Sequence, residues 1–214
     1  MQVLVDNDIL VKGACYGLFE ELFGQSSQHN EELGVLGAAK FVVAKAIQSI
    51  RLQGDPERGI ERLKIFLERC TCVEPTDEEQ NLAAEFELQA QQAGVALDSG
   101  ESQLCAVLIV RALPLLHTGD KRAIQALEEL LTCHQKLQSL CGKVLCLEQL
   151  VLSCTSKENL KFIRAAICSE PDVDKALSIS FSCKSKDTTF EIVAEGLNSY
   201  INYLRQQAPQ VLAS

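Results

Sequence analysis

The sequence lacks the features that mark membrane-spanning and secreted proteins. Its 214 residues contain no run of 18 uncharged apolar residues, so we expect no transmembrane helix. The first eight residues, MQVLVDND, carry no basic residue before the first acid, which argues against a signal peptide. We therefore expect a cytoplasmic protein.

Cysteine and histidine are present, but not at the spacing of a zinc site. The chain has ten cysteines and no Cys-x-x-Cys pair. Its histidines lie far apart in the sequence, at His29, His117 and His134. Several cysteines fall inside helical patterns: Cys105, Cys146 and Cys168. We therefore expect reduced cysteines in the core instead of a zinc site or a disulfide framework.

Basic residues are scarce in the first half of the chain. Residues 1–110 hold 8 Lys or Arg against 18 Asp or Glu, whereas residues 111–214 hold 12 against 11. No basic residue lies between Arg69 and Arg111, and the acids from Glu74 to Glu87 fit a solvated helix face. The broad basic surface that binds duplex nucleic acid is absent. A nucleic-acid substrate would have to be held by a local basic rim and by metal ions.

The composition is that of a soluble globule, with 47% hydrophobic and 23% charged residues. The most informative stretch is Leu97–Asp120, which reads as a turn, a helix that is apolar all round, and a short strand. Pro114 separates helix from strand, and Gly119-Asp120 ends the strand. Glu101 and Asp120 therefore lie at opposite ends of one buried helix–strand unit.

The rest of the chain reads as alternating strands and helices. Predicted strands are 2–5, 70–74, 115–117 and 143–147, and residues 177–182 alternate as a short strand would. Predicted helices are 8–23 (ended by Gly24), 31–53, 56–67, 77–90, 101–110, 121–140, 150–154, 160–168 and 190–204, with a polar loop at 25–30. Asp55 is the expected N-cap before Pro56, and Thr76 with Glu79 forms a capping box.

Acidic residues follow three of the buried apolar segments. Asp6 and Asp8 come after the first strand, Asp98 and Glu101 open the central helix, and Asp120 ends the next strand. Each acid alone is explained as a helix cap, and Asp98-x-x-Glu101 has capping-box spacing. Their recurrence favours a site, because parallel strands bring their carboxyl ends to one edge of the sheet. Clustered carboxylates repel unless a cation neutralises them, and hard oxygen ligands suit Mg²⁺ or Mn²⁺.

Three segments resemble the PIN-domain nucleases: VLVDNDIL at Val3–Leu10, LDSGESQLCAV at Leu97–Val107 and LLHTGDKRAI at Leu115–Ile124. The resemblance covers about Met1–Gln149. It implies a three-layer α/β/α domain around a central parallel sheet at 1–149, with 150–214 as a helical extension packed on the same core. It also implies catalytic and metal-binding roles for Asp6, Glu101 and Asp120.

The resemblance suggests further roles around these acids. Asp8, where the family often has Asn, and Asp98 would be outer ligands. Thr118 and Glu148 are accessory candidates, and Lys121 is a candidate contact for the substrate phosphate.

The sequence departs from the family at its second acid. The region LGAAKFVVAKAIQSI has no carboxylate, and none occurs between Glu32 and Asp55. Lys40 or Lys45 stands in the expected place, where a lysine either lies along a helix face or contacts a phosphate.

Three functions fit these patterns. The first is a divalent-metal-dependent ribonuclease acting on single-stranded or structured RNA, which the resemblance links to toxin–antitoxin pairs and an inhibitory partner protein. A homodimer is a further expectation for this reading. The second is a PIN-like module that has lost catalysis and binds RNA or protein. The third is a haloacid-dehalogenase-type phosphohydrolase, suggested by Asp6-Asn7-Asp8, although Leu10 stands where that motif requires Thr.

Overall fold

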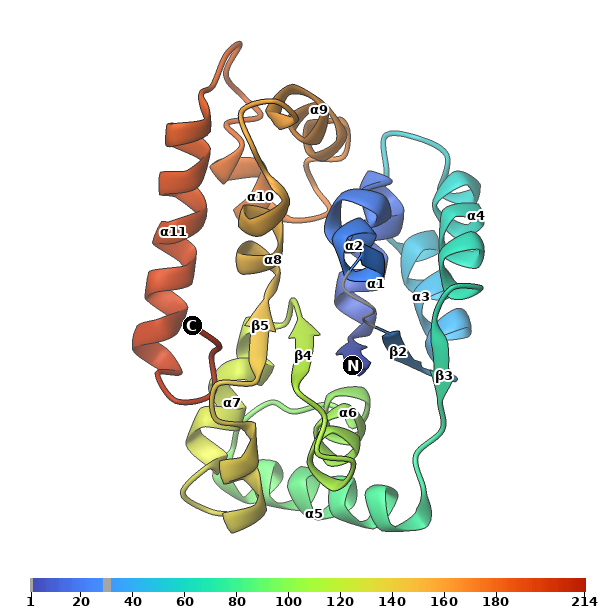
Figure 1. Cartoon of the computed structure of the whole chain (residues 1–214), viewed down its shortest axis with the longest axis vertical. Helices are drawn as coiled ribbons and strands as arrows, with labels where there is room; N and C mark the ends of the chain where they lie inside the picture. Colours follow the sequence, from blue (N-terminus) through green and yellow to red (C-terminus); the bar gives the residue numbers. More distant parts are fainter. Residues whose placement is uncertain (1, 29–31) are drawn as a thin grey trace.

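A computed structural model of the chain describes residues 2–28 and 32–214, with the side chains of 25–28 excepted. Strands and helices alternate through most of the chain (Figure 1). The elements are β1 (Gln2–Val5), α1 (Asn7–Tyr16), α2 (Phe19–Gln28), β2 (Glu32–Leu36), α3 (Ala39–Ser49), α4 (Pro56–Leu67), β3 (Thr71–Val73), α5 (Asp77–Ala93), α6 (Ser99–Val110), β4 (Leu115–Thr118), α7 (Lys121–Leu130), the 3₁₀ helix η1 (Gln135–Leu140), β5 (Val144–Cys146), α8 (Leu147–Cys154), α9 (Leu160–Ser169), α10 (Lys175–Ser180) and α11 (Phe190–Gln207).

The strands form one five-stranded sheet in the order β3-β2-β1-β4-β5, and every pair in it is parallel. In the central pair Val3 lies opposite Leu115 and Val5 opposite His117. The prediction that the strands at 2–5, 115–117 and 143–147 are parallel members of one sheet is confirmed. The carboxyl ends of β1, β4 and β5 consequently lie at the same edge.

Helices cover both faces of the sheet, so the chain is an α/β protein with two hydrophobic cores. Successive side chains of β1 point into different cores. Val3 and Val5 pack with α1 to α4 and α8 to α11, whereas Leu4 packs with α5, α6 and α7. In Figure 1, α5, α6 and α7 occupy the lower part of the molecule, and most other helices lie beside or above the strands. This division follows from the two-residue period of a strand.

The segment from residue 150 to the C-terminus contributes to both cores. Phe181 and Leu197 are fully buried with the residues of α1, whereas Leu212 packs on the opposite face. The last residues run beside β5, where Ala213 N donates a hydrogen bond of 2.7 Å to Val144 O. The C-terminal segment is therefore integral to the packing of the sheet.

One predicted helix is wrong at its start. Residues 32–36 of the predicted helix 31–53 form β2, and the helix begins only at Ala39; residue 31 lies outside the described part. Gly34 is packed between neighbouring strands, where a Cβ would lie 3.0 Å from both Leu4 Cδ2 and Val73 Cγ2. The apolar residues of the strand and of the helix share a spacing that mimics one continuous helix.

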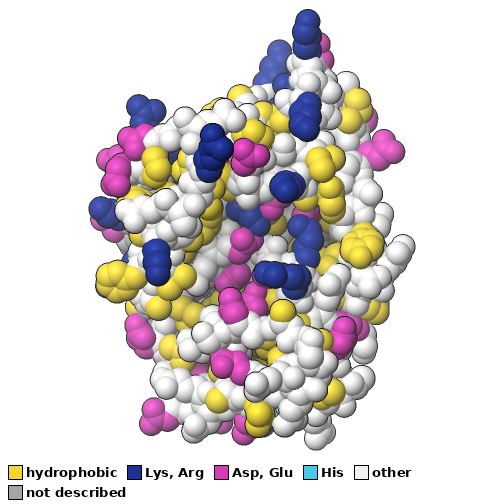
Figure 2. All heavy atoms as spheres, turned by 180° about the vertical axis from the view of Figure 1, so that it is seen from behind, with side chains coloured by type: hydrophobic (Ala, Val, Ile, Leu, Met, Phe, Trp, Pro, Cys, Tyr) yellow, Lys and Arg dark blue, Asp and Glu magenta, His cyan; other side chains and the backbone are white. Residues whose placement is uncertain are grey.

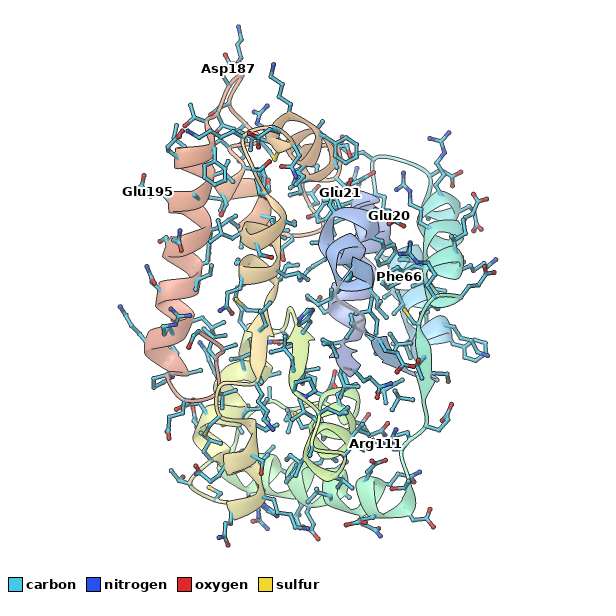
Figure 3. All side chains as sticks on the ribbon, viewed as in Figure 1. Glu20, Glu21, Phe66, Arg111, Asp187 and Glu195 are labelled. Carbon is cyan, nitrogen blue, oxygen red and sulfur yellow. A yellow bond between two sulfur atoms is a disulfide. The ribbon has the colours of Figure 1, made fainter. Side chains whose placement is uncertain are left out.

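The predicted helix 8–23 is interrupted. Gly17, with φ of +68°, ends α1 in the left-handed conformation, and α2 begins at Phe19. Phe19 then stacks on Phe66 of α4 with 4.0 Å between ring centroids (Phe66 is labelled in Figure 3). Gly24 does not end the second helix, which continues through the predicted loop to Gln28; residues 29–30 of that loop lie outside the described part.

Three further predictions need correction. The helix predicted over 121–140 ends at Leu130 and is followed by η1, and residues 175–180 form the helix α10 instead of a strand. Cys168 is not a reduced core cysteine, because it forms a disulfide with Cys183.

The strand near 70–74, the N-cap Asp55 and the capping boxes at Thr76 and Asp98 are confirmed. Among the described residues, no helix is both long and apolar enough to cross a bilayer.

We expect Gly17→Ala to destabilise the protein more than Gly94→Ala, although both glycines have positive φ. A Cβ at Gly94 meets nothing within 4 Å, so the cost there is backbone strain of about 1 kcal/mol. A Cβ at Gly17 would lie 2.8 Å from Arg62 Cζ and displace a guanidinium that donates to Ala14 O. The extra cost should be about 1 kcal/mol in the free energy of unfolding measured with urea. Equal losses in the two variants would contradict this reading of Gly17.

Candidate functional site

The carboxyl ends of the two central strands are tied together by side chains. Asp6 follows β1 and caps α1, where its carboxylate accepts from Asn7 N at 2.7 Å. The buried hydroxyl of Thr118, the last residue of β4, donates to the same carboxylate at 3.0 Å. Thr118 Oγ1 also accepts from Asp120 N at 3.2 Å. The accessory residue of the sequence prediction therefore positions Asp6 and the loop that carries Asp120.

Helix α6 brings Glu101 to this edge. Residues Leu104–Leu108 are almost completely buried, which fixes the helix within the core. At its N-terminus Asp98 N donates to Glu101 Oε2 and Glu101 N donates to Asp98 Oδ1, both at 2.9 Å. A Cβ on Gly100 would lie 3.7 Å from Asn7 Nδ2, so the starts of α6 and α1 are adjacent. Glu101 therefore caps α6 and also lies at the carboxyl edge of the sheet.

Asp6 and Glu101 are buried carboxylates without a counter-ion among the described residues. The two residues are 5% and 7% exposed, and neither makes an ion pair with a described Lys, Arg or His. Burial raises the pKa of Asp6 to about 6, with a further contribution from Asp8. Burial also raises the pKa of Glu101 to about 8, and the charges of Asp98, Asp6 and Asp120 add to the shift. The neighbouring acids therefore disfavour the ionised forms of both residues.

Asp120 is at the same edge but has a different environment. It caps α7 and accepts from Arg122 N at 2.8 Å and Ala123 N at 3.3 Å. The exposed guanidinium of Arg122 lies 3.1 Å from its Oδ2. Burial opposes ionisation of Asp120, but the hydrogen bonds from Arg122 and Ala123 hold its pKa below the usual value. Asp120 is therefore ionised and open to solvent at the rim of the site.

A buried lysine that the sequence did not single out lies beside these acids. Lys12 of α1 is 7% exposed and pairs with Asp8 and with Asp174, whose Oδ2 is 3.0 Å from its Nζ. A Cβ on Gly119 would overlap Asp8 Oδ2, so only glycine leaves room for this arrangement. The spacing of Asp8 and Lys12 is a recognisable helical ion pair. No sequence pattern links Asp174 to Lys12, because the two residues lie far apart in the sequence.

A second ion pair involves two residues of the sequence prediction. Lys121 Nζ lies 2.6 Å from Glu148 Oε1, and Glu148, in the first turn of α8, is 1% exposed. Lys121 also lies over the ring of Tyr200 at 5.8 Å from its centroid. The predicted phosphate contact and the predicted accessory acid therefore neutralise each other.

The two other candidate phosphate contacts lie elsewhere on the surface. Lys40 and Lys45 are exposed on α3, and Lys40 Nζ lies 4.8 Å from the ring centroid of Phe41. Helix α3 contributes no acid, so the departure from the family pattern is present in the folded chain. His117 near the edge is buried and stacks on Phe23, and burial lowers its pKa to about 4, which keeps its ring neutral.

The oxygen donors at the edge match the chemistry of Mg²⁺ or Mn²⁺, but they are not arranged as a finished ligand set. In residues 2–28 and 32–214, no group of three or more His, Cys, Asp or Glu side chains has the geometry to hold a metal ion. Glu101 is turned to the backbone of Asp98, Asp120 to Arg122, and Asp8 to Lys12. Binding one ion between Asp6, Glu101 and Asp120 would require Glu101 and Asp120 to change rotamer.

Figure 2 shows one face of the molecule with a hollow near its middle. Asp and Glu side chains gather in this hollow, and Lys and Arg side chains lie around it. This distribution contrasts with the net charge of −9 of the whole chain. An acidic chain therefore carries a local gathering of basic side chains on this face.

No protein-family model matches this chain, and neither the curated proteins nor the solved structures contain a match to it.

The raised pKa of Glu101 gives a pH dependence with a definite sign. Between pH 4.5 and 8 the unfolded chain loses the Glu101 proton while the folded chain keeps it, so stability falls as pH rises and levels off above pH 8. Glu101→Gln retains the cap acceptor and should reduce this fall by on the order of 1–2 kcal/mol in urea titrations at pH 5 and pH 8.

Glu79→Gln is the matched control, because Glu79 occupies the same capping-box position in α5. Its carboxylate is paired with Arg111 at 2.6 Å (Arg111 is labelled in Figure 3), and hydrogen bonds from Arg111 lower its pKa. Relative to the wild type, Glu79→Gln should be destabilised more at pH 8 than at pH 3. This pH dependence has the opposite sign to the one expected for Glu101→Gln. A Glu101→Gln variant that also lost stability at pH 8 would contradict the unpaired state of Glu101.

Proposed function

We propose that the chain is a PIN-like ribonuclease that hydrolyses phosphodiester bonds with one divalent metal ion. The observation that carries the proposal is the pair of buried carboxylates, Asp6 and Glu101, which share one sheet edge and have no described counter-ion. Buried charges are normally paired or coordinate metals. A bound cation would remove the cost of ionising two neighbouring acids in one desolvated site.

Two further features support the proposal. The segments that resemble the PIN-domain nucleases supply Asp6, Glu101 and Asp120, all of which lie at or beside the carboxyl ends of β1 and β4. The α/β architecture with a central parallel sheet is also the one that the resemblance implies.

The residues at the edge can be given separate roles. Asp6, Glu101 and Asp120 would hold Mg²⁺ or Mn²⁺, which when bound activates a water molecule and shields the charge of the phosphodiester. Thr118 keeps the Asp6 carboxylate in place, and Asp98 fixes the start of α6. Arg122 is exposed beside Asp120 and is suited to contact a phosphate when Asp120 turns to the metal.

The preferred substrate is single-stranded RNA. The chain lacks a broad basic face, so binding would depend on the rim of the site and not on an extended duplex footprint. Lys121 can contribute only if it leaves Glu148, and Lys40 and Lys45 would contact a strand that extends over α3.

A second candidate function is a PIN-like module that binds RNA without cleaving it. It is favoured by the absence of an acid on α3 together with the neutralisation of Asp8 by Lys12. Both features reduce the negative charge available to a metal ion. RNA binding without cleavage in the presence of Mn²⁺ would select this alternative.

Mn²⁺ at millimolar concentration should raise the melting temperature of the full chain, because a ligand that binds only the folded state stabilises it. Mn²⁺ should act more strongly than Mg²⁺, since it binds a given site more tightly. Asp6→Asn keeps the N-cap of α1 and should abolish the rise in thermal melting measured by circular dichroism. The same rise in wild type and Asp6→Asn would show that the ion binds elsewhere.

Asp120→Asn should lower the rate of Mn²⁺-dependent cleavage of a labelled single-stranded RNA by roughly 100-fold, because a group that stabilises transition-state charge is lost. Asp55→Asn is the matched control: Asp55 is also an N-cap, on α4, and it is exposed. Asn caps a helix as well as Asp, so both variants should remain folded. Equal rates in Asp120→Asn and Asp55→Asn would refute a catalytic role for Asp120.

A further inference from the structure

The ammonium group of Lys12 lies inside the protein, beside the carboxylates of the proposed site. The side chain of Lys12 is 9% exposed, and its Nζ pairs with Asp8 of its own helix and with Asp174 at the start of α10. A buried ammonium is costly unless carboxylates compensate it. Here two carboxylates from distant parts of the chain provide that compensation, and their charges raise the pKa of Lys12 above its ordinary value against the effect of burial.

Asp174 is held firmly in position to receive this lysine. Its Oδ1 accepts from Leu177 N at 2.9 Å, and its side chain is 9% exposed. The segment that carries it is closed by the Cys168–Cys183 disulfide. Glu170 of the same segment accepts from Gln53 N and Gly54 N, both at 2.7 Å, which ties the segment to the loop before α4.

The pairing also fixes Asp8. Its Oδ2 contacts Lys12 Nζ and is packed against Gly119, where a Cβ would overlap it. The same hypothetical Cβ would lie 3.0 Å from Lys12 Nζ, so lysine and aspartate both abut the loop between Thr118 and Asp120. Asp8 is therefore turned toward a fixed internal cation at the edge where Asp120 begins α7.

We propose that Lys12, paired with Asp8 and Asp174, is a built-in cation of the carboxylate edge that withholds Asp8 from metal binding and limits the site to one divalent ion. Lys12 is a positioning residue, because it acts on the site through Asp8. This inference rests on the proposed function for the identity of the ligand, a divalent metal ion. Its own claim is that Lys12 keeps Asp8 from binding that ion. The C-terminal segment supplies, through Asp174, a second partner for this lysine.

The test is isothermal titration of the full-length chain with MnCl₂, comparing wild type, Lys12→Met, Lys12→Arg and Asp174→Asn. Removing the cation releases Asp8, so Lys12→Met should bind Mn²⁺ at least tenfold more tightly or bind a second ion. Lys12→Arg keeps the charge and should behave as wild type. Asp174→Asn leaves Lys12 paired with Asp8 and should not tighten binding, which controls for general loosening of the site.

Thermal melting establishes that each variant is folded. If Lys12→Met fails to fold because Asp174 is left buried without a partner, the double variant Lys12→Met/Asp174→Asn removes that charge and takes its place. If the double variant also fails to fold, Asp8→Asn in the wild-type background decides: unchanged Mn²⁺ binding supports the inference, and weaker binding overturns it.

The outcomes separate the inference from the proposed function. Binding by Lys12→Met but not by wild type would support the withholding of Asp8 by Lys12, and it would overturn both the one-ion site and a metal-dependent function of the natural chain. Equal binding by wild type and Lys12→Met would support the function and overturn the inference. Absence of binding in both would overturn both, and tightening in Asp174→Asn equal to that in Lys12→Met would also overturn the role of Lys12.

Discussion

The parallel pairing of β1 with β4 is the constraint on which the site depends. Because Val3 lies opposite Leu115 and Val5 opposite His117, both strands end at the same level, and the loops that follow them are neighbours. The hydrogen bond from Thr118 to Asp6 closes this junction inside the protein. An antiparallel arrangement of the same two strands would have placed Asp6 and Asp120 at opposite edges of the sheet. The position of Asp6 beside the loop of Asp120 therefore follows from strand direction.

The carboxylates at the edge differ mainly in how their charge is balanced. Glu148 and Asp174 are buried, and each has a lysine within 3.0 Å. Asp6 and Glu101 are equally buried and rely on neutral donors, so their ionised forms are disfavoured. An ion pair offsets the free-energy cost of burying its two charges, whereas an unpaired buried acid lowers the stability of the fold at neutral pH. The difference separates the acids that are paired with lysines from Asp6 and Glu101, the two acids on which the proposed metal site rests.

The parts of the structure that were predictable from sequence are those encoded locally. The N-caps Asp55, Thr76 and Asp98 each act within three or four residues, so their pattern is visible in a short window. The strand β2 was hidden because its five residues join the periodicity of the following helix. The contact of Lys12 with Asp174 and the Cys168–Cys183 disulfide depend on tertiary packing, which brings a C-terminal helix against α1. Asp6, Glu101 and Asp120 were singled out because they stand where a helix begins after an apolar segment, whereas the pairing of Lys12 with Asp174 could be found only in the folded chain.

The most direct measurement is anomalous diffraction at the manganese absorption edge from crystals of the chain grown with MnCl₂. One anomalous peak within coordination distance of the Asp6 and Glu101 carboxylates is expected, with Asp8 still paired to Lys12. Such a peak would identify the unpaired acids as metal ligands and the lysine as a fixed cation. Crystals that contain Mn²⁺ in the solvent but show no peak at this edge, with Asp6 and Glu101 in the positions described, would contradict a metal-dependent site.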